Sequence, residues 1–533
     1  MVGGNDGTLT GGDRRVIATE SADVGFRLLL AVLIFVGIAT RAAPLLDQGG
    51  RLMNAPTDDG YLMLTIARNL AIGKGFTVSD GTTLTNGTQP LATLLYAVVF
   101  AVVGGHRRAG VAIVLVLQLI AACCAAIALR QLGRKVLHAR DDGKTIADLS
   151  AAVWFASPVT VRHTVNFLET GMYGLVVILA GLALFPILSS SAERTGYPRY
   201  VSLGVLLGVA FWVRNDAIFL VLATCLTVLF NAFPRGWMRA QGWFGAIVTG
   251  ITSIVVAAPW LYFNYSRFGH IVPVSGRAET LEAAQSIFVL PSVLVSYLLM
   301  ISPIPRAVED KPVVIAASLL LLVGAAMVLG QVWRAAREEE RRWMAWAGLY
   351  AAFLILFYGL FFGVPTFLSR FLFPISPFFA LVWGVAVCKA WRSARQRGFR
   401  KMAQLAAAAL CAAAIGVHLR SYRNLRGHLQ LQMLRWVNGH VPEPTWIGAL
   451  QSGTLGFFHD RTINFDGKVN PAAYQARLND RIGDYLVASP IEYLVDWVGI
   501  LDYYRLPNVR ENFEIIVDDL DENLAVMKRR HAR

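Results

Sequence analysis

The sequence predicts an α-helical membrane protein that crosses the bilayer many times and carries a small exterior α/β domain at its C-terminal end. Hydrophobic residues make up 55% of the 533 residues, charged residues only 16%, and the mean hydropathy is +0.51. Soluble globular chains carry about 25% charged residues. Apolar stretches long enough to cross a bilayer recur from about residue 26 to residue 419, and they stop at Arg420.

The net charge of +14 lies in this apolar part of the chain. From Arg420 onward Lys and Arg number 14, and Asp and Glu also number 14. The excess therefore precedes that residue, where it gathers in short loops such as 130–140 and 388–401. Short basic loops beside membrane spans are retained in the cytoplasm, so the pattern favours an orientation signal over a nucleic-acid-binding face.

The loop charges predict a topology of about eleven spans, with the N-terminus inside and the C-terminus outside. Arg14 and Arg15 hold the N-terminus in the cytoplasm, so the first span delivers Asp58 and Asp59 to the exterior. The loops beginning at Arg130, Glu193, Arg235, Arg334 and Lys389 are then all cytoplasmic. The predicted spans lie near 26–43, 110–130, 146–162, 171–189, 200–213, 215–232, 243–262, 312–333, 344–363, 371–390 and 402–419.

Two further apolar stretches, 90–105 and 286–302, do not fit this count as crossings. Counting either as a full span would place a basic loop outside the membrane. We therefore expect both to lie along the outer surface or to re-enter it.

Three domains follow from the composition. Residues 1–25 are Gly-rich and polar without a signal-peptide cleavage pattern, which predicts a disordered cytoplasmic N-terminus. Residues 26–420 form the membrane domain, and residues 421–533 form the exterior domain. In the exterior domain, 446–470 reads as strands and loops and 481–497 as helices.

The stretch "NAPTDDGYLMLTIARNLAIGKGF", residues 54–76, follows the first span directly. Thr57 or Asp58 can cap a helix whose apolar positions 62, 66 and 70 recur every four residues, and Gly73 ends it. We expect this helix to lie flat on the outer face. One carboxylate at its start is explained by capping and by the helix dipole, but two suggest more. A carboxylate that accepts a proton from an attacking hydroxyl is a general base.

Each of the other outward turns also carries an arginine. A single arginine at a span end is explained by snorkelling to the interface, but four together favour a site for a phosphate group. The ionisable and amide candidates in these turns are Arg162, His163, Glu169, Arg214, Asp216, Asn264, Arg277 and Arg370.

The order of these motifs carries a resemblance. The outward Asp-Asp pair, "ARNLAIGKGF", "NGTQPL", "NFLETG", "RND", "PW…FNY…FG…P.SG" and "SRFLFP" follow one another over about residues 60–470. This order resembles the GT-C superfamily of polyprenyl-phosphate-dependent glycosyltransferases, closest to its protein mannosyltransferase-like and cell-wall arabinofuranosyltransferase branch. Arg277 stands where a lysine is frequent, and "RND" where "RPD" or "RPE" is usual, which leaves the sugar open.

The resemblance implies a GT-C fold and transfer of a sugar from a polyprenyl phosphate carrier to a glycan, lipid or protein acceptor. It makes Asp58 the general base, with Asp59 as the alternative, on the outer face of the inner (plasma) membrane. We expect no cofactor and no metal, although Asp58, Asp59 and Glu169 could hold a metal ion by charge alone. The implied substrate-binding residues are Glu169, His163, Arg214, Asp216, Asn264, Arg277 and Arg370.

Two other functions are compatible with the sequence. A flippase or transporter of lipid-linked sugars would need no bond chemistry, but such proteins often contain internal repeats, and we find none. A glycoside hydrolase would need two carboxylates flanking a sugar, which Asp58 and Glu169 could supply. The gathering of polar residues at one face favours an enzyme.

Overall fold

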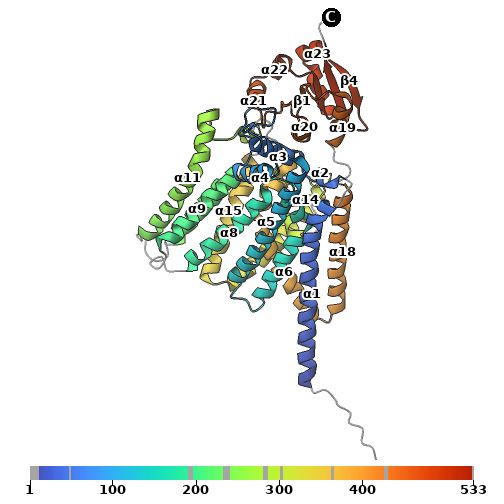
Figure 1. Ribbon diagram of the computed structural model, residues 1–533. Helices are drawn as coiled ribbons and strands as arrows, with labels where there is room; N and C mark the ends of the chain where they lie inside the picture. The colour runs from blue at the N-terminus through green and yellow to red at the C-terminus, as the bar shows by residue number, and fades with distance from the viewer. Residues whose placement is uncertain are drawn as a thin grey trace, which may run out of the picture.

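A bundle of long helices makes up most of the chain, and a domain with a β-sheet sits at one end of it (Figure 1). The computed structural model describes residues 11–46, 50–189, 196–231, 240–279, 286–300, 304–305, 307–361, 365–424 and 430–530. The bundle and its connections comprise α1 (Gly11–Leu46), α2 (Arg51–Asn54), α3 (Asp58–Ala71), α4 (Pro90–Val102), α5 (Arg107–Val136), α6 (Gly143–Ala156), α7 (Pro158–Thr164), α8 (Thr170–Ser189), α9 (Tyr197–Val213), η2 (Asn215–Ala217), α10 (Ile218–Asn231), α11 (Ala240–Phe268), α12 (Val274–Ala278), α13 (Leu290–Leu299), α14 (Pro312–Ala335), α15 (Glu338–Leu356), η5 (Phe357–Phe361), η6 (Pro365–Phe367), α16 (Leu368–Leu372), η7 (Phe373–Ile375), α17 (Ser376–Gln396) and α18 (Arg400–Asn424).

Each predicted span overlaps one or more of these helices, and the predicted span near 146–162 is divided at Ser157 into α6 and α7. Within the described residues, eight helices are long and apolar enough to cross a membrane. The helices α6, α9 and α10 have only 14, 17 and 14 residues. At about 1.5 Å per residue they reach about 21 to 26 Å, less than the hydrocarbon thickness of about 30 Å. The multi-pass membrane fold is therefore confirmed, and the count of eleven spans stays a prediction.

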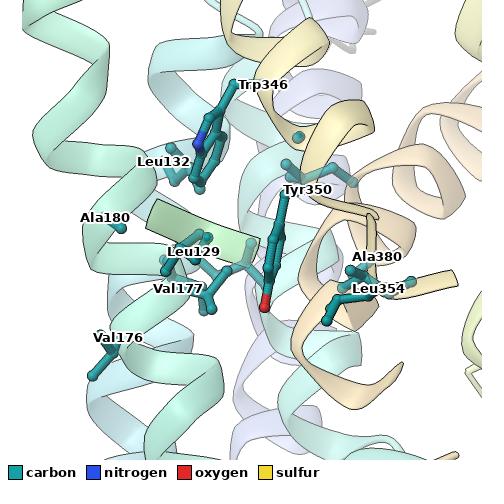
Figure 2. Close-up of a cluster of buried hydrophobic side chains, with 14 of the residues drawn as sticks. Leu129, Leu132, Val176, Val177, Ala180, Trp346, Tyr350, Leu354 and Ala380 are labelled. Carbon is teal, nitrogen blue, oxygen red and sulfur yellow. The ribbon is translucent and has the colours of Figure 1, made fainter. Parts of the chain in front are cut away.

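Side chains from four helices meet in the core of the bundle (Figure 2). Trp346 and Tyr350 of α15 are both fully buried. Each satisfies its polar atom, because the Trp346 indole donates to Thr224 Oγ1 at 3.0 Å and the Tyr350 and Tyr173 hydroxyls lie 3.1 Å apart. Buried polar groups are costly without such partners. Around them pack Leu129, Leu132, Val176, Val177, Ala180, Leu354 and Ala380.

The helix α3 lies across the end of the bundle, beneath the sheet domain (Figure 1). Its boundaries confirm the sequence prediction, since the Thr57 hydroxyl caps it by accepting from the Gly60 amide at 3.1 Å, and Gly73 after it has a φ of +82°. The buried face differs from the expected one. Tyr61, Leu64 and Ile66 are fully buried, whereas positions 62 and 70 are only half-buried. The bundle and the sheet domain cover α3 from different sides, so it has no single apolar face.

The two apolar stretches that do not fit the span count form the short helices α4 and α13, of 13 and 10 residues. Both are too short to cross the hydrocarbon core at about 1.5 Å per residue. Residues 301 and 302 of the second stretch lie outside the described residues. At the start of the chain, α1 begins at Gly11, inside the stretch 1–25 for which the composition predicts disorder. Residues 1–10 lie outside the described residues.

The C-terminal domain contains a five-stranded sheet in the order β2-β1-β3-β5-β4. The strands β2, β1 and β3 are parallel, while β5 is antiparallel to both β3 and β4. The predicted small α/β domain is thus confirmed. Its elements are α19 (Leu431–His440), β1 (Ile447–Ala449), α20 (Gly453–Phe458), β2 (Thr462–Asn464), α21 (Pro471–Leu478), α22 (Ile482–Ala488), β3 (Tyr493–Asp496), η9 (Val498–Arg505), α23 (Pro507–Asn512), β4 (Phe513–Asp519) and β5 (Leu524–Arg529).

Two local predictions in this domain were wrong. Gly453–Phe458 forms the helix α20 where strands and loops were expected, and Tyr493–Asp496 forms the strand β3 where a helix was expected. Leu494 and Val495 are fully buried, because β3 lies between β1 and β5 with both faces covered. The sequence of a strand that is buried on both faces is a continuous apolar run. A buried helix gives the same pattern, so the pattern alone does not distinguish the two.

Candidate active site between bundle and exterior domain

Asp58 joins the bundle to the exterior domain. It is the first residue of α3 and is only 8% exposed. Its Oδ2 accepts a hydrogen bond from the Gly453 amide at 3.0 Å, and its Oδ1 accepts from the Thr454 amide at 2.7 Å and from the Thr454 hydroxyl at 2.8 Å. Burial raises the pKa of Asp58, more than these bonds lower it. The Asp58 carboxylate thus links the first residues of α20 to the start of α3 by hydrogen bonds.

Only glycine fits at position 453. A Cβ there would lie 1.9 Å from the carbonyl oxygen of Asp58, far inside van der Waals contact. The chain also approaches closely at Gly87, where a Cβ would lie 2.2 Å from the carbonyl oxygen of Lys468. The exterior domain therefore packs against the bundle backbone to backbone at two places.

Asp59 points to different partners. A third of its side chain (33%) is exposed, and its Oδ2 pairs with Arg370 Nη1 at 2.5 Å. Burial alone would raise the pKa of Asp59, but the charges of Arg370 and Lys468 outweigh it and hold the pKa below its ordinary value. Asp59 is therefore an ionised and accessible carboxylate at neutral pH.

Arg370 lies on α16 between two aromatic rings. Its guanidinium carbon is 5.1 Å from the ring centroids of both Phe367 and Phe371. Its Nε is buried, and nothing in the described part of the chain accepts a hydrogen bond from it. A planar guanidinium with a spare N–H is suited to a phosphate oxygen.

Lys468 and Glu279 complete this group, and the sequence analysis missed both. Lys468 Nζ pairs with Glu279 at 2.9 Å and lies 5.5 Å from the Phe367 ring. Behind it, burial raises the pKa of Asp466 to about 6, against the attraction of Lys468. The available signal was the segment "NFDGKVN", in which Gly467, with a φ of +86°, forms the turn that presents Lys468.

Asn264 lies near the end of α11 and Arg277 lies on α12, which follows it in the chain. Arg277, on α12, places its guanidinium carbon 4.8 Å from the Tyr474 ring of the exterior domain. Asn264 is fully buried; its Oδ1 accepts from Asn86 Nδ2 at 3.2 Å, and its own amide donates to the Ile271 carbonyl at 3.3 Å. Asn264 thus holds the chain that leads into α12, and Arg277 meets the exterior domain.

Glu169, Arg214 and Asp216 form a separate buried network. Arg214 is 2% exposed and pairs with Glu169 at 3.0 Å and with Asp216 at 2.8 Å. The Tyr358 hydroxyl donates to Asp216 at 2.7 Å. The Arg214 guanidinium carbon lies 5.1 Å from the Phe371 ring, which also contacts Arg370. These charges are already paired, so the network supports the segment that carries Arg370.

His163 lies in α7 and is 5% exposed. Its ring centroid is 5.2 Å from that of Phe373 and 6.5 Å from that of Tyr297. His163 therefore lies in an aromatic cluster next to η7, which directly follows α16 and its Arg370.

The described residues contain no group of three His, Cys, Asp or Glu side chains placed to hold a metal ion. Asp58, Asp59 and Glu169 therefore do not fit as joint metal ligands. Glu169 pairs with Arg214, while the two aspartates turn to different partners.

Comparisons with known proteins agree with this architecture. Residues 420–528 match a family described as a domain of unknown function (DUF8728). No curated protein matches the chain by sequence. Among solved structures, ArnT from Cupriavidus metallidurans bound to undecaprenyl phosphate is similar at 13% identity and a TM-score of 0.57, over 95% of this chain and 98% of that one. The apo state of the same protein is similar at 14% identity and a TM-score of 0.57, over 96% and 98%.

A second protein shares the fold. The oligosaccharyltransferase of Archaeoglobus fulgidus, in complex with Zn and sulfate, is similar at 12% identity and a TM-score of 0.55, over 91% of this chain and 71% of that one. Both similarities extend over the bundle and the exterior domain. The chain therefore has a GT-C-like fold, as the order of its motifs predicts.

Proposed function

We propose that this protein is a membrane glycosyltransferase that moves a sugar from a polyprenyl phosphate carrier to an acceptor hydroxyl on the extracytoplasmic face. The observation that carries the proposal is the contact of the accessible carboxylate Asp59 with Arg370, beside Lys468, at the outer end of a GT-C-like bundle. A base and a phosphate site have to adjoin for this reaction. The ArnT structure with undecaprenyl phosphate supports the carrier class.

The general base is assigned to Asp59, the alternative of the sequence analysis, in place of Asp58. Both oxygens of Asp58 accept hydrogen bonds from Gly453 and Thr454, and its side chain is buried. A base must reach the proton that it removes, at hydrogen-bond distance or through one water. Asp59 meets this condition because a third of its side chain is exposed.

The reaction is a single displacement. Asp59 takes the proton of the acceptor hydroxyl while that oxygen attacks the anomeric carbon of the sugar. The bond from the anomeric carbon to the carrier phosphate breaks, and its electron pair leaves on the phosphate. Arg370 and Lys468 stabilise this negative charge. The carrier phosphate competes with Asp59 for the charges of Arg370 and Lys468. Donor binding therefore weakens the attraction of these cations for Asp59, which raises its pKa and makes it a stronger base.

The remaining candidates take supporting roles in this proposal. Arg277 lies within the same interface, next to Tyr474, and its proposed role is contact with the sugar or the phosphate. Glu169, Arg214 and Asp216 act through the Arg370 segment, without contact to the substrate. The acceptor is a glycan, a lipid or a protein of the cell envelope.

A transfer assay separates this function from its alternatives. Purified protein in detergent with a polyprenyl-phosphate sugar and an acceptor sugar is expected to release free carrier phosphate and form a glycosylated acceptor, both measured by mass spectrometry. A flippase would leave the donor bond intact. A hydrolase would release the sugar at the same rate when the acceptor is omitted. Either outcome would remove the transferase assignment.

The proposed localisation is the inner (plasma) membrane, with the site on the exterior side. Single cysteines placed at the exposed positions Thr82 and Asn479 are expected to react with a membrane-impermeant maleimide in intact cells. Cysteines at the exposed positions Lys144 and Arg397 are expected to react only after the cells are opened. Labelling of position 397 in intact cells would invert the orientation and contradict the exterior site.

A further inference from the structure

A cluster of cations lies at the opposite end of α3 from Asp59. Arg68 is nine residues further along this helix, about 13 Å at 1.5 Å per residue. Three cations surround the single carboxylate of Asp460, from the exterior domain: Lys74 at 2.7 Å, Arg107 at 3.1 Å and Arg68 at 3.6 Å.

The cluster carries more positive charge than its carboxylate can neutralise. Burial lowers the pKa of Arg68, and repulsion from Arg107 lowers it further, against the attraction of Asp460. The Nε of Arg107 is buried, and no acceptor for it exists among the described residues. Arg108 adds one more exposed cation at the start of α5. Three cations therefore face one anion, Arg108 follows directly in the chain, and one N–H donor has no acceptor among the described residues.

The surface beside this cluster is apolar. Val98 and Val102 of α4 are 63% and 79% exposed, and Ile72 after α3 is 39% exposed. α4 ends just before Arg107 and lies at the outer end of the bundle (Figure 1). A short helix with exposed apolar side chains beside cations is the arrangement of an element that lies in the membrane interface. The acyl region covers such side chains, and head groups face the cations.

We propose that Arg107 and Arg108, with Arg68 and Lys74, bind the head group of an anionic phospholipid in the outer leaflet, with its acyl chains over α4. The lipid phosphate supplies the negative charge that Asp460 cannot, and it accepts hydrogen bonds from the exposed part of the Arg107 guanidinium, whose side chain is 34% exposed. This site is separate from Asp59 and does not depend on the proposed transfer reaction.

Native mass spectrometry of the full-length protein tests the proposal. The protein is purified in mixed micelles that hold equal amounts of phosphatidylglycerol and phosphatidylcholine, without any polyprenyl donor. We expect the wild-type protein to retain phosphatidylglycerol preferentially. Since each basic side chain near a charged leaflet contributes about fivefold to affinity, Arg108→Gln is expected to weaken retention about 5-fold and the Arg107→Gln/Arg108→Gln double variant about 30-fold.

Arg267→Gln is the matched control, because Arg267 is also an exposed arginine at a helix end, in the last turn of α11. Its retention of phosphatidylglycerol is expected to equal that of the wild type. Arg108 makes no bond to Asp460, so Arg108→Gln decides the matter if the double variant unfolds. Equal retention of both lipids by the wild type, full retention by Arg108→Gln, or an equal loss in Arg267→Gln would overturn the proposal.

Discussion

Replacing Asp59 by asparagine is expected to lower the rate of sugar transfer by about 10² to 10⁴-fold, because a general base contributes a factor of this size. The amide keeps the shape of the side chain but cannot accept the proton. Donor binding should be kept or strengthened, since Arg370 and Lys468 remain and the amide no longer competes with the phosphate for their charge. The measurement is the turnover number at saturating donor and acceptor.

Asp58→Asn is the informative comparison. An amide nitrogen at Oδ2 would face the Gly453 amide, and two donors repel each other. This variant is expected to loosen the exterior domain, which hydrogen exchange in α20 would detect as faster exchange. In Asp59→Asn the exchange of α20 should match the wild type. If Asp58→Asn abolished transfer with unchanged exchange while Asp59→Asn kept near-normal turnover, the base would be Asp58.

Replacing Arg370 by alanine is expected to weaken the use of the donor by about 10 to 150-fold. A charge-assisted hydrogen bond to the carrier phosphate contributes about 1.5 to 3 kcal/mol, which corresponds to this range. Arg370→Lys should rescue only in part, because the planar guanidinium contacts the rings of Phe367 and Phe371 and an ammonium does not reproduce its shape. Donor titrations with both variants, and with Arg267→Ala as the control, measure the effect.

The pH dependence of transfer provides a second test of the role of Arg370. Arg370 and Lys468 lower the pKa of Asp59 in the protein without donor, so kcat/KM of the wild type, which reports that state, should persist below the ordinary titration range of a carboxyl group. Activity is present above this pKa and falls as pH drops through it. Arg370→Ala removes one of the two cations, so the acidic limb should move to higher pH. An arginine that only anchors the helix at the interface would leave both donor affinity and this limb unchanged, and lysine would replace it fully.

The membrane helices could be predicted from the sequence because lipid leaves the backbone little choice. Backbone groups in hydrocarbon must pair within the segment, so apolar runs of sufficient length form helices. The helix α20 could not be predicted in this way. It has six residues, too few to be stable alone, and Asp58 from a distant part of the chain binds its first amides.

The candidate site could be predicted in part. Asp58, Asp59 and Arg370 stood out because charges at the ends of apolar spans need a reason. Neighbouring residues of a helix point about 100° apart, so only the docked exterior domain decides which aspartate is covered and which is accessible. Lys468 and Glu279 were missed for the same reason. Each is an ordinary charged residue of a polar turn until the fold brings the two turns within 2.9 Å.

The contact between Asp58 and Gly453 joins residues 395 positions apart in the chain. During synthesis at about 5 to 20 residues per second, roughly 20 to 80 s separate the emergence of the two partners. During that interval the helices of the bundle can insert and pack, while the Asp58 carboxylate at the start of α3 remains exposed to water. The exterior domain, translated after the bundle, then covers this carboxylate and brings Lys468 to Asp59. The proposed site is thus assembled only after the exterior domain has been translated, so shorter nascent or truncated chains in the membrane are expected to contain Asp59 and Arg370 without Lys468.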